Sequence, residues 1–65
     1  MNEAKNNIKM VLEQQGRSQV WLAKAIGKSV NTVNAYVQNR TQPSLETLYE
    51  IARILNVTPK DLLNQ

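Results

Sequence analysis

The sequence predicts an all-α fold, a compact five-helix bundle in which residues 1–65 form a single domain. Residues with high helix propensity (Ala, Leu, Lys, Gln and Glu) are abundant, whereas glycine and proline number two each and phenylalanine is absent. The chain is shorter than half of a typical domain of about 150 residues, so it has room for one core only. It contains no cysteine, so no disulfide can supplement that core.

Apolar residues recur at the helical period in segments that are bounded by typical start and stop residues. This pattern predicts helices over about residues 3–15, 19–26, 30–38, 45–55 and 59–63. Side-chain caps are expected before the last four helices, at Ser18, Ser29, Ser44 and Thr58. Residues that end a helix, by a left-handed conformation or otherwise, are expected after the first four, at Gly16, Gly27, Asn39 and Asn56. The polar stretch from Arg40 to Pro43 is the main loop.

The helices predicted over residues 19–26 and 30–38 are short, and only residues 27–29 connect them. A connection this tight cannot lay the two helices antiparallel over much of their length, so they must cross steeply. Ala23 is small where the second helix approaches closely, and Gly27 can take the positive φ that such a turn requires. Ile26 and Val33 can pack across the corner. This geometry is that of a helix-turn-helix.

The order of residues in three segments is typical of a known protein family. These segments are SQVWLAKAIG at residues 18–27, TVNAYVQNRTQPSL at residues 32–45 and LYEIARILNV at residues 48–57. Together they resemble the phage repressor and Cro class of helix-turn-helix regulators, the XRE family, over about residues 8–63. The resemblance implies a lambda-repressor-like fold with the helix-turn-helix at about residues 19–38. It also implies a sequence-specific regulator of transcription, a repressor, whose helix over residues 30–38 enters the major groove of double-stranded DNA.

The chain departs from the usual pattern of this family at three positions. Asn39 stands where glycine is common. Leu12 and Val37 stand where the family often has an Arg and a Glu that pair between the first and third helices. We infer that an apolar contact between Leu12 and Val37 replaces the ion pair. Such a replacement is often neutral or stabilising, because neither charge has to be desolvated.

The helix predicted over residues 30–38 has a polar face. With Val33 as the inward direction and about 100° per residue, the inward side also holds Val30, Tyr36 and Val37. The outward side holds Asn31, Ala35 and Gln38, with Asn34 at its flank. An asparagine can offer adenine a donor and an acceptor together, and an alanine methyl can touch the methyl group of thymine. The residues predicted to contact bases are Val30, Asn31, Asn34 and Ala35.

Positive charge is concentrated in the first part of the chain. Residues 1–40 contain six bases and two acids, a charge of +4, whereas residues 41–65 contain two bases and three acids, a charge of −1. By the family resemblance, Gln19 holds a phosphate at the amino end of its helix, where the helix dipole favours an anion. The residues predicted to contact DNA phosphates are Gln19, Lys28, Ser29, Thr32, Gln38, Arg40, Thr41 and Gln42. Arg17 and Lys24 are interpreted as charges that aid solubility.

Two protein partners are also considered. A single module contacts too few base pairs for selectivity, so a homodimer is expected, with Leu62, Leu63 and exposed parts of the last two helices as candidate surfaces. Alternatively, the fold is a protein-interaction module of the antitoxin type that binds its partner through Trp21 and these leucines. Trp21 has two interpretations: an anchor for a partner, or an indole that lies over a neighbouring helix with its N–H in water.

The residue types argue against other classes of function. The chain has no His or Cys, and its five acids show no paired arrangement, so no enzyme is expected. Zinc lacks its usual ligands, and no metal or cofactor is predicted. No apolar run approaches the ~20 residues that span a bilayer, and the amino terminus lacks the apolar core of a signal peptide. A cytoplasmic protein without a membrane partner is therefore expected.

Overall fold

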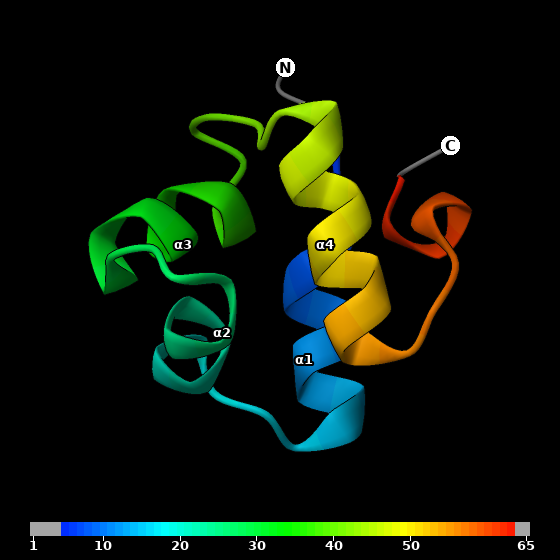
Figure 1. Ribbon diagram of the computed structural model, residues 1–65, viewed down its shortest axis with the longest axis horizontal. Helices are drawn as coiled ribbons and strands as arrows, with labels where there is room; N and C mark the ends of the chain where they lie inside the picture. The colour runs from blue at the N-terminus through cyan, green and yellow to red at the C-terminus, as the bar shows by residue number, and fades with distance from the viewer. Residues whose placement is uncertain (1–4, 64–65) are drawn as a thin grey trace.

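Four α-helices and one short 3₁₀ helix follow one another in residues 5–63, the part of the chain that this computed structural model describes. They are α1 (Ile8–Gln15), α2 (Gln19–Ile26), α3 (Val30–Val37), α4 (Leu45–Leu55) and η1 (Pro59–Leu62). Figure 1 shows α2 and α3 on one side of α4 and η1 on the other side. The prediction of an all-α fold is confirmed.

The predicted caps set most of the helix boundaries. A backbone N–H three residues later donates to the side chain of each of the four caps, Ser18, Ser29, Ser44 and Thr58. Left-handed residues end α1, α2 and α4, at Gly16, Gly27 and Asn56. Asn39 is also left-handed, with φ of 59°. Because each of these signals is local, α2 and α4 have the predicted bounds, and α3 ends only one residue early.

The first helix begins later than predicted. Glu3, the predicted start, lies outside the described residues, but residues 5–7 are not helical and α1 begins at Ile8. Asn6 Oδ1 accepts a hydrogen bond from the backbone N–H of Ile8 at 3.1 Å. Asparagine often forms local bonds of this kind, which compete with a helical backbone. The predicted start is therefore wrong because the asparagines at positions 6 and 7 lead into the helix instead of continuing it.

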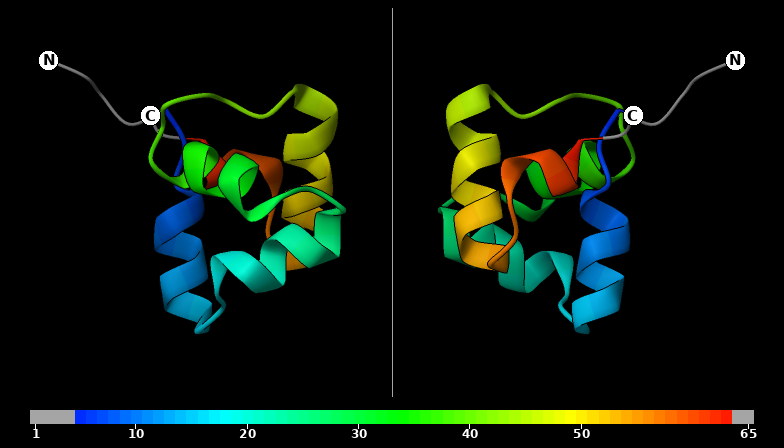
Figure 2. Two further views of the ribbon diagram at one scale, coloured as in Figure 1. Left: turned by 90° about the vertical axis from the view of Figure 1, so that its left-hand side faces the viewer. Right: turned by 90° about the vertical axis from the view of Figure 1, so that its right-hand side faces the viewer.

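The last predicted helix is a 3₁₀ helix of four residues, so the five-helix bundle is a bundle of four α-helices within residues 5–63. Thr58 and Asp61 form a capping box at its start. At Leu63 the chain is extended and forms an antiparallel bridge with Asn6, and the N–H of Asn7 donates to the carbonyl of Leu62 at 2.8 Å. This pairing, visible in Figure 2 as the two described ends lying side by side, prevents the helix from continuing.

One hydrophobic core joins all five elements. Its large side chains that are almost completely buried are Ile8, Leu22, Val33, Ile51, Leu55 and Leu62. Leu12 of α1 and Val37 of α3 are also buried in this core, as the inferred apolar replacement of the ion pair requires. Leu62 is 0% exposed, so its predicted role in a dimer or partner surface is wrong.

Candidate nucleic-acid interface

The core holds α3 by one face and leaves the other face open. Val33, Tyr36 and Val37 are buried, as predicted, but Val30 is 42% exposed, so its predicted inward position is wrong. Val30 is the first residue of α3, directly after the cap Ser29, where the helix begins beyond the edge of the core. It is therefore accessible, as its predicted base contact requires.

The open face of α3 carries the other residues predicted to meet DNA. Asn31 and Gln38 are exposed, and Thr32, Asn34 and Ala35 are half-buried. Within residues 5–63, the side chain of Asn31 makes no hydrogen bond. Its amide is therefore available to a ligand that approaches α3.

Ser29 and Thr32 are joined by two hydrogen bonds at the start of α3. Ser29 Oγ accepts a hydrogen bond from the Thr32 N–H at 3.1 Å and donates one to Thr32 Oγ1 at 2.9 Å. Since Thr32 accepts in this pair, its own hydroxyl proton can be donated to an anion. The pair therefore presents one further donor beside the open face.

Asn34 connects α2 to the loop that follows α3. Its Nδ2 donates to Gln19 Oε1 at 3.1 Å, and its Oδ1 accepts from Arg40 Nη2 at 3.1 Å. The Arg40 Nη1 donates to Gln38 Oε1. Two acceptors thus hold the Arg40 guanidinium along the end of α3, and further N–H donors of this group remain for a ligand.

The amino-terminal segment fixes the loop after α3. Asn39 Oδ1 accepts hydrogen bonds from the backbone N–H groups of Lys5 at 2.8 Å and Asn6 at 2.9 Å. Gln42 joins the same network, because its Nε2 donates to Asn39 Oδ1 at 3.0 Å and its Oε1 accepts from Asn6 Nδ2 at 2.9 Å. Both ends of the Gln42 amide are therefore engaged within the protein, whereas Thr41 is exposed.

Sequence reasoning missed two residues of this region. Asn6 is 4% exposed, and its Nδ2 also donates to the carbonyl of Tyr36 at 2.9 Å. This bond supplies a partner for one of the backbone carbonyls at the end of α3, which have none within the helix. Lys5 lies against the loop through its bond to Asn39 and brings a positive charge to it. The partners in these bonds are 30 to 36 residues apart in sequence, so no local pattern could have indicated them.

The helix-turn-helix and its following loop carry only positive charges. Between Glu13 and Glu46 the chain has no acid, and its bases are Arg17, Lys24, Lys28 and Arg40. A surface with this excess of positive charge attracts polyanions over a distance set by the salt concentration.

Acidic residues first reappear at the start of α4. Lys28 lines a shallow pocket with Ile26, Glu46, Thr47 and Glu50, so this lysine shares a surface hollow with two acidic residues. On the same helix, Arg53 Nη2 lies 2.6 Å from Glu50 Oε1. The hydrogen bond to Glu50 and the charge of its carboxylate raise the pKa of Arg53, and this ion pair adds no uncompensated charge.

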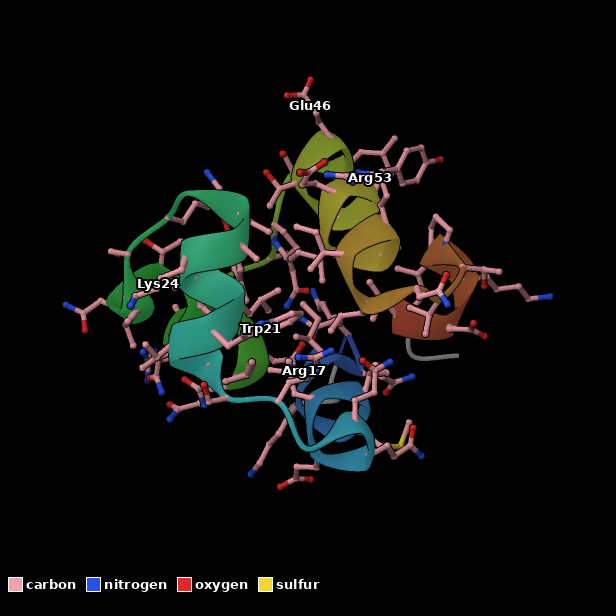
Figure 3. All side chains as sticks on the ribbon, turned by 60° about the horizontal axis from the view of Figure 1, so that its bottom comes forward. Arg17, Trp21, Lys24, Glu46 and Arg53 are labelled. Carbon is pink, nitrogen blue, oxygen red and sulfur yellow. The ribbon has the colours of Figure 1, made fainter. Side chains whose placement is uncertain are left out.

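Trp21 packs on the core of its own chain. Its side chain is half-buried against the core cluster, and the guanidinium carbon of Arg17 lies 4.3 Å from the centroid of its ring. Figure 3 shows Arg17 beside the inward-turned indole, whereas Lys24 points away. This cation–π geometry favours the packing interpretation of Trp21 over the anchor, and it gives Arg17 a contact in addition to its charge.

The order and geometry of these helices match a known family. The family model of the helix-turn-helix matches residues 8–62. The chain belongs to this helix-turn-helix family. The resemblance to the phage repressor and Cro class, drawn from the residues alone, is thereby confirmed.

A solved structure is similar to this member of the helix-turn-helix family. It is described as a "putative DNA-binding protein" from Bacteroides fragilis, and it shares 45% sequence identity with the chain at a TM-score of 0.91. The match covers 92% of this chain and 97% of that chain. No curated protein sequence matches the chain significantly.

Two kinds of feature are absent from residues 5–63. No cluster of three or more His, Cys, Asp or Glu side chains could hold a metal ion there. None of the helices in this range is long and apolar enough to cross a membrane.

Proposed function

We propose that the protein binds double-stranded DNA in a sequence-specific manner and regulates transcription as a repressor, with α3 in the major groove. The orientation of α3 carries this proposal, because Val33 and Val37 face the core while Asn31 is exposed. Membership of the helix-turn-helix family and the likeness to a protein described as DNA-binding support it. The role is one of binding, not of catalysis.

Base recognition is assigned to the open face of α3. The major groove is about 12 Å wide and admits an α-helix. The Asn31 amide can contact adenine at two points, because its Nδ2 can donate to N7 while its Oδ1 accepts from the N6 amino group. A contact through both atoms is selective for adenine. Val30 and Ala35 offer apolar contacts to a thymine methyl.

Phosphate contacts are assigned to residues on the two flanks of α3. On the flank of Asn34, Gln19 and the first backbone N–H groups of α2 present donors at the positive end of a helix. Arg40 lies on the same flank, because it also bonds to Asn34, and Thr41 and Lys5 lie near it. Thr32 adds a hydroxyl on the opposite flank of the helix. Such contacts supply most of the affinity without selecting a sequence.

A homodimer is part of the proposal. Leu45 and Tyr49 are 65% and 54% exposed and lie one turn apart on α4, so they form an apolar patch that a second copy would cover. A two-fold axis through such a contact would present two α3 helices to half-sites about 10 base pairs apart.

The decisive experiment selects preferred sites from random duplexes, first with the wild-type protein and then with Asn31→Ala. We expect Asn31→Ala to lose roughly 1–3 kcal/mol of discrimination at one base position. Gln14→Ala, which removes an exposed amide from α1, is the matched control and should leave the selected sequence unchanged. An unaltered preference in Asn31→Ala would refute the assignment of this residue.

A second candidate function is a protein-interaction module of the antitoxin type, and the exposed Leu45 and Tyr49 favour it. The salt dependence of binding separates the two functions. DNA affinity falls steeply as salt rises, because bound counterions are released from the phosphates. An apolar protein interface would respond little to the same change.

A further inference from the structure

The Asn34 side chain uses both its Nδ2 and its Oδ1 in hydrogen bonds within the protein, whereas the Asn31 side chain forms no hydrogen bond within the described residues. The donor of Asn34 is used by Gln19 and its acceptor by Arg40, each at 3.1 Å. We propose that Asn34 is a positioning residue that aligns Gln19 and Arg40 for two DNA phosphates, instead of the base-contacting residue that the sequence predicts. This inference rests on the proposed DNA binding.

The bond to Gln19 fixes which way the Gln19 amide faces. Its oxygen accepts from Asn34, so its Nε2 group must point away from Asn34. Gln19 is the first residue of α2, beside backbone N–H groups that have no partner within the helix. With Asn34 in place, the side chain therefore adds donors to this anion site, and an amide turned the other way would add a repelling oxygen.

The bond to Arg40 restricts a long and flexible side chain. Arg40 is exposed in a loop, yet its guanidinium is held by Asn34 Oδ1 and by Gln38 Oε1. An arginine that is already ordered loses less conformational freedom when it binds a phosphate. Removal of Asn34 leaves one of the two acceptors and a less ordered group.

A base contact by Asn34 would break this arrangement. Recognition of adenine uses an amide N–H and the amide oxygen of one asparagine together. To turn that edge to a base, Asn34 would have to release Gln19 or Arg40, which are themselves placed to contact the backbone. Asn31 has no such commitment within the described residues.

The first test measures the affinities of wild-type, Asn34→Ala and Asn31→Ala proteins for the selected site and for its single-base variants. We expect Asn34→Ala to weaken binding about tenfold on every duplex, because ordered contacts to two phosphates are lost. The order of preference among bases should stay that of the wild type. Asn31→Ala is the matched control, since it should change the preference at one position.

The second test asks whether Asn34 couples Gln19 to Arg40. In the wild-type background, we compare the double variant Gln19→Ala/Arg40→Ala with the two single variants. Its loss of affinity should be smaller than the product of the two single losses by a factor of about three or more. In the Asn34→Ala background the two losses should simply multiply. A purely structural role of Asn34 would lower the unfolding midpoint without abolishing the coupling, so thermal unfolding of each variant is recorded as well.

Three results would overturn the inference: a changed base preference in Asn34→Ala, an unchanged affinity in Asn34→Ala, or a coupling that persists without Asn34. Asn34→Ser serves as a second variant, because its shorter side chain cannot bridge both partners. Failure of the proposed function looks different. In that case the wild-type protein selects no duplex at all, and nuclear magnetic resonance of the Arg40 side chain still shows whether Asn34 orders it.

Discussion

Asparagine side chains occupy several positions where the chain needs a short amide. Asn6 is buried and joins the amino-terminal segment to the end of α3. Asn39 and Asn56 take left-handed conformations that most residues avoid. The Oδ1 of Asn39 also accepts hydrogen bonds from two backbone N–H groups. Asn34 bridges two segments, and Asn31 stays exposed. The same residue type thus has roles in folding and in the proposed recognition, and only the surroundings distinguish them.

A charge at position 37 should destabilise the fold. Val37 is buried with Leu12 in the core, so Val37→Glu would place a carboxylate there without a partner. We expect a loss of about 3–5 kcal/mol in the free energy of unfolding, as for other uncompensated buried charges. Urea denaturation of the variant and the wild type measures this loss.

Two companion variants make this result specific. Val20→Glu changes an exposed valine on α2 and should stay within about 0.5 kcal/mol of the wild type. Leu12→Arg added to Val37→Glu restores the pair that is common in the family and should recover part of the lost stability. If Val37→Glu unfolds at the same urea concentration as the wild type, the apolar contact does not exist.

At the scale of elements, the turn between α2 and α3 depends on Gly27. Its φ is +71°, and a Cβ placed on it would meet no atom within 4 Å. The cost of a side chain there is therefore backbone strain alone, about 1–2 kcal/mol for Gly27→Ala.

Gly27→Asn should cost less than Gly27→Ala, because asparagine tolerates this conformation. Both variants should keep the wild-type base preference, since the turn retains its shape. Unfolding in urea gives the two stabilities. An alanine variant as stable as the wild type would show that the turn does not need a left-handed residue.

Helix boundaries were predictable where local residues set them. Ser18 and Gly27 define α2 within the segment itself, and the prediction is confirmed at both ends. The start of α1 was only partly predictable. The asparagine at position 6 is a local signal for it, but residues 5–7 are also held by bonds to Asn39 and Leu62, which are distant in sequence. Periodicity shows which residues can form a helix, but it does not show which tertiary partners hold the backbone in another conformation.

The candidate site was predictable to a similar extent. The periodicity placed Asn31 on the open face, where the structure has it. The inward direction failed for Val30, because a helix period does not show where the core ends. The bonds of Asn34 and Gln42 to other segments could not be derived either, since they require the relative positions of α2, α3 and the amino-terminal segment.

At the scale of the whole molecule, the apolar patch of Leu45 and Tyr49 predicts cooperative binding. The variant with Leu45→Ala and Tyr49→Ala should keep its affinity for a single half-site, because α3 is untouched. Its affinity for a two-fold symmetric site should fall toward the single-site value, because the contact between copies is lost. Gel-shift titrations on both duplexes measure the difference.

Met10→Ala is the control for this patch, because Met10 is an exposed apolar residue on another helix, α1. It should leave binding to both duplexes unchanged. Equal cooperativity in the wild type and the Leu45/Tyr49 variant would place the dimer contact elsewhere.

The single tryptophan of the chain makes these variants easy to follow. The indole of Trp21 is half-buried, and a cationic group covers its ring, so its fluorescence in the native state differs from that of a fully hydrated indole. Unfolding removes both conditions together. The protein therefore carries its own spectroscopic label, and no dye or added chromophore is needed to record its melting.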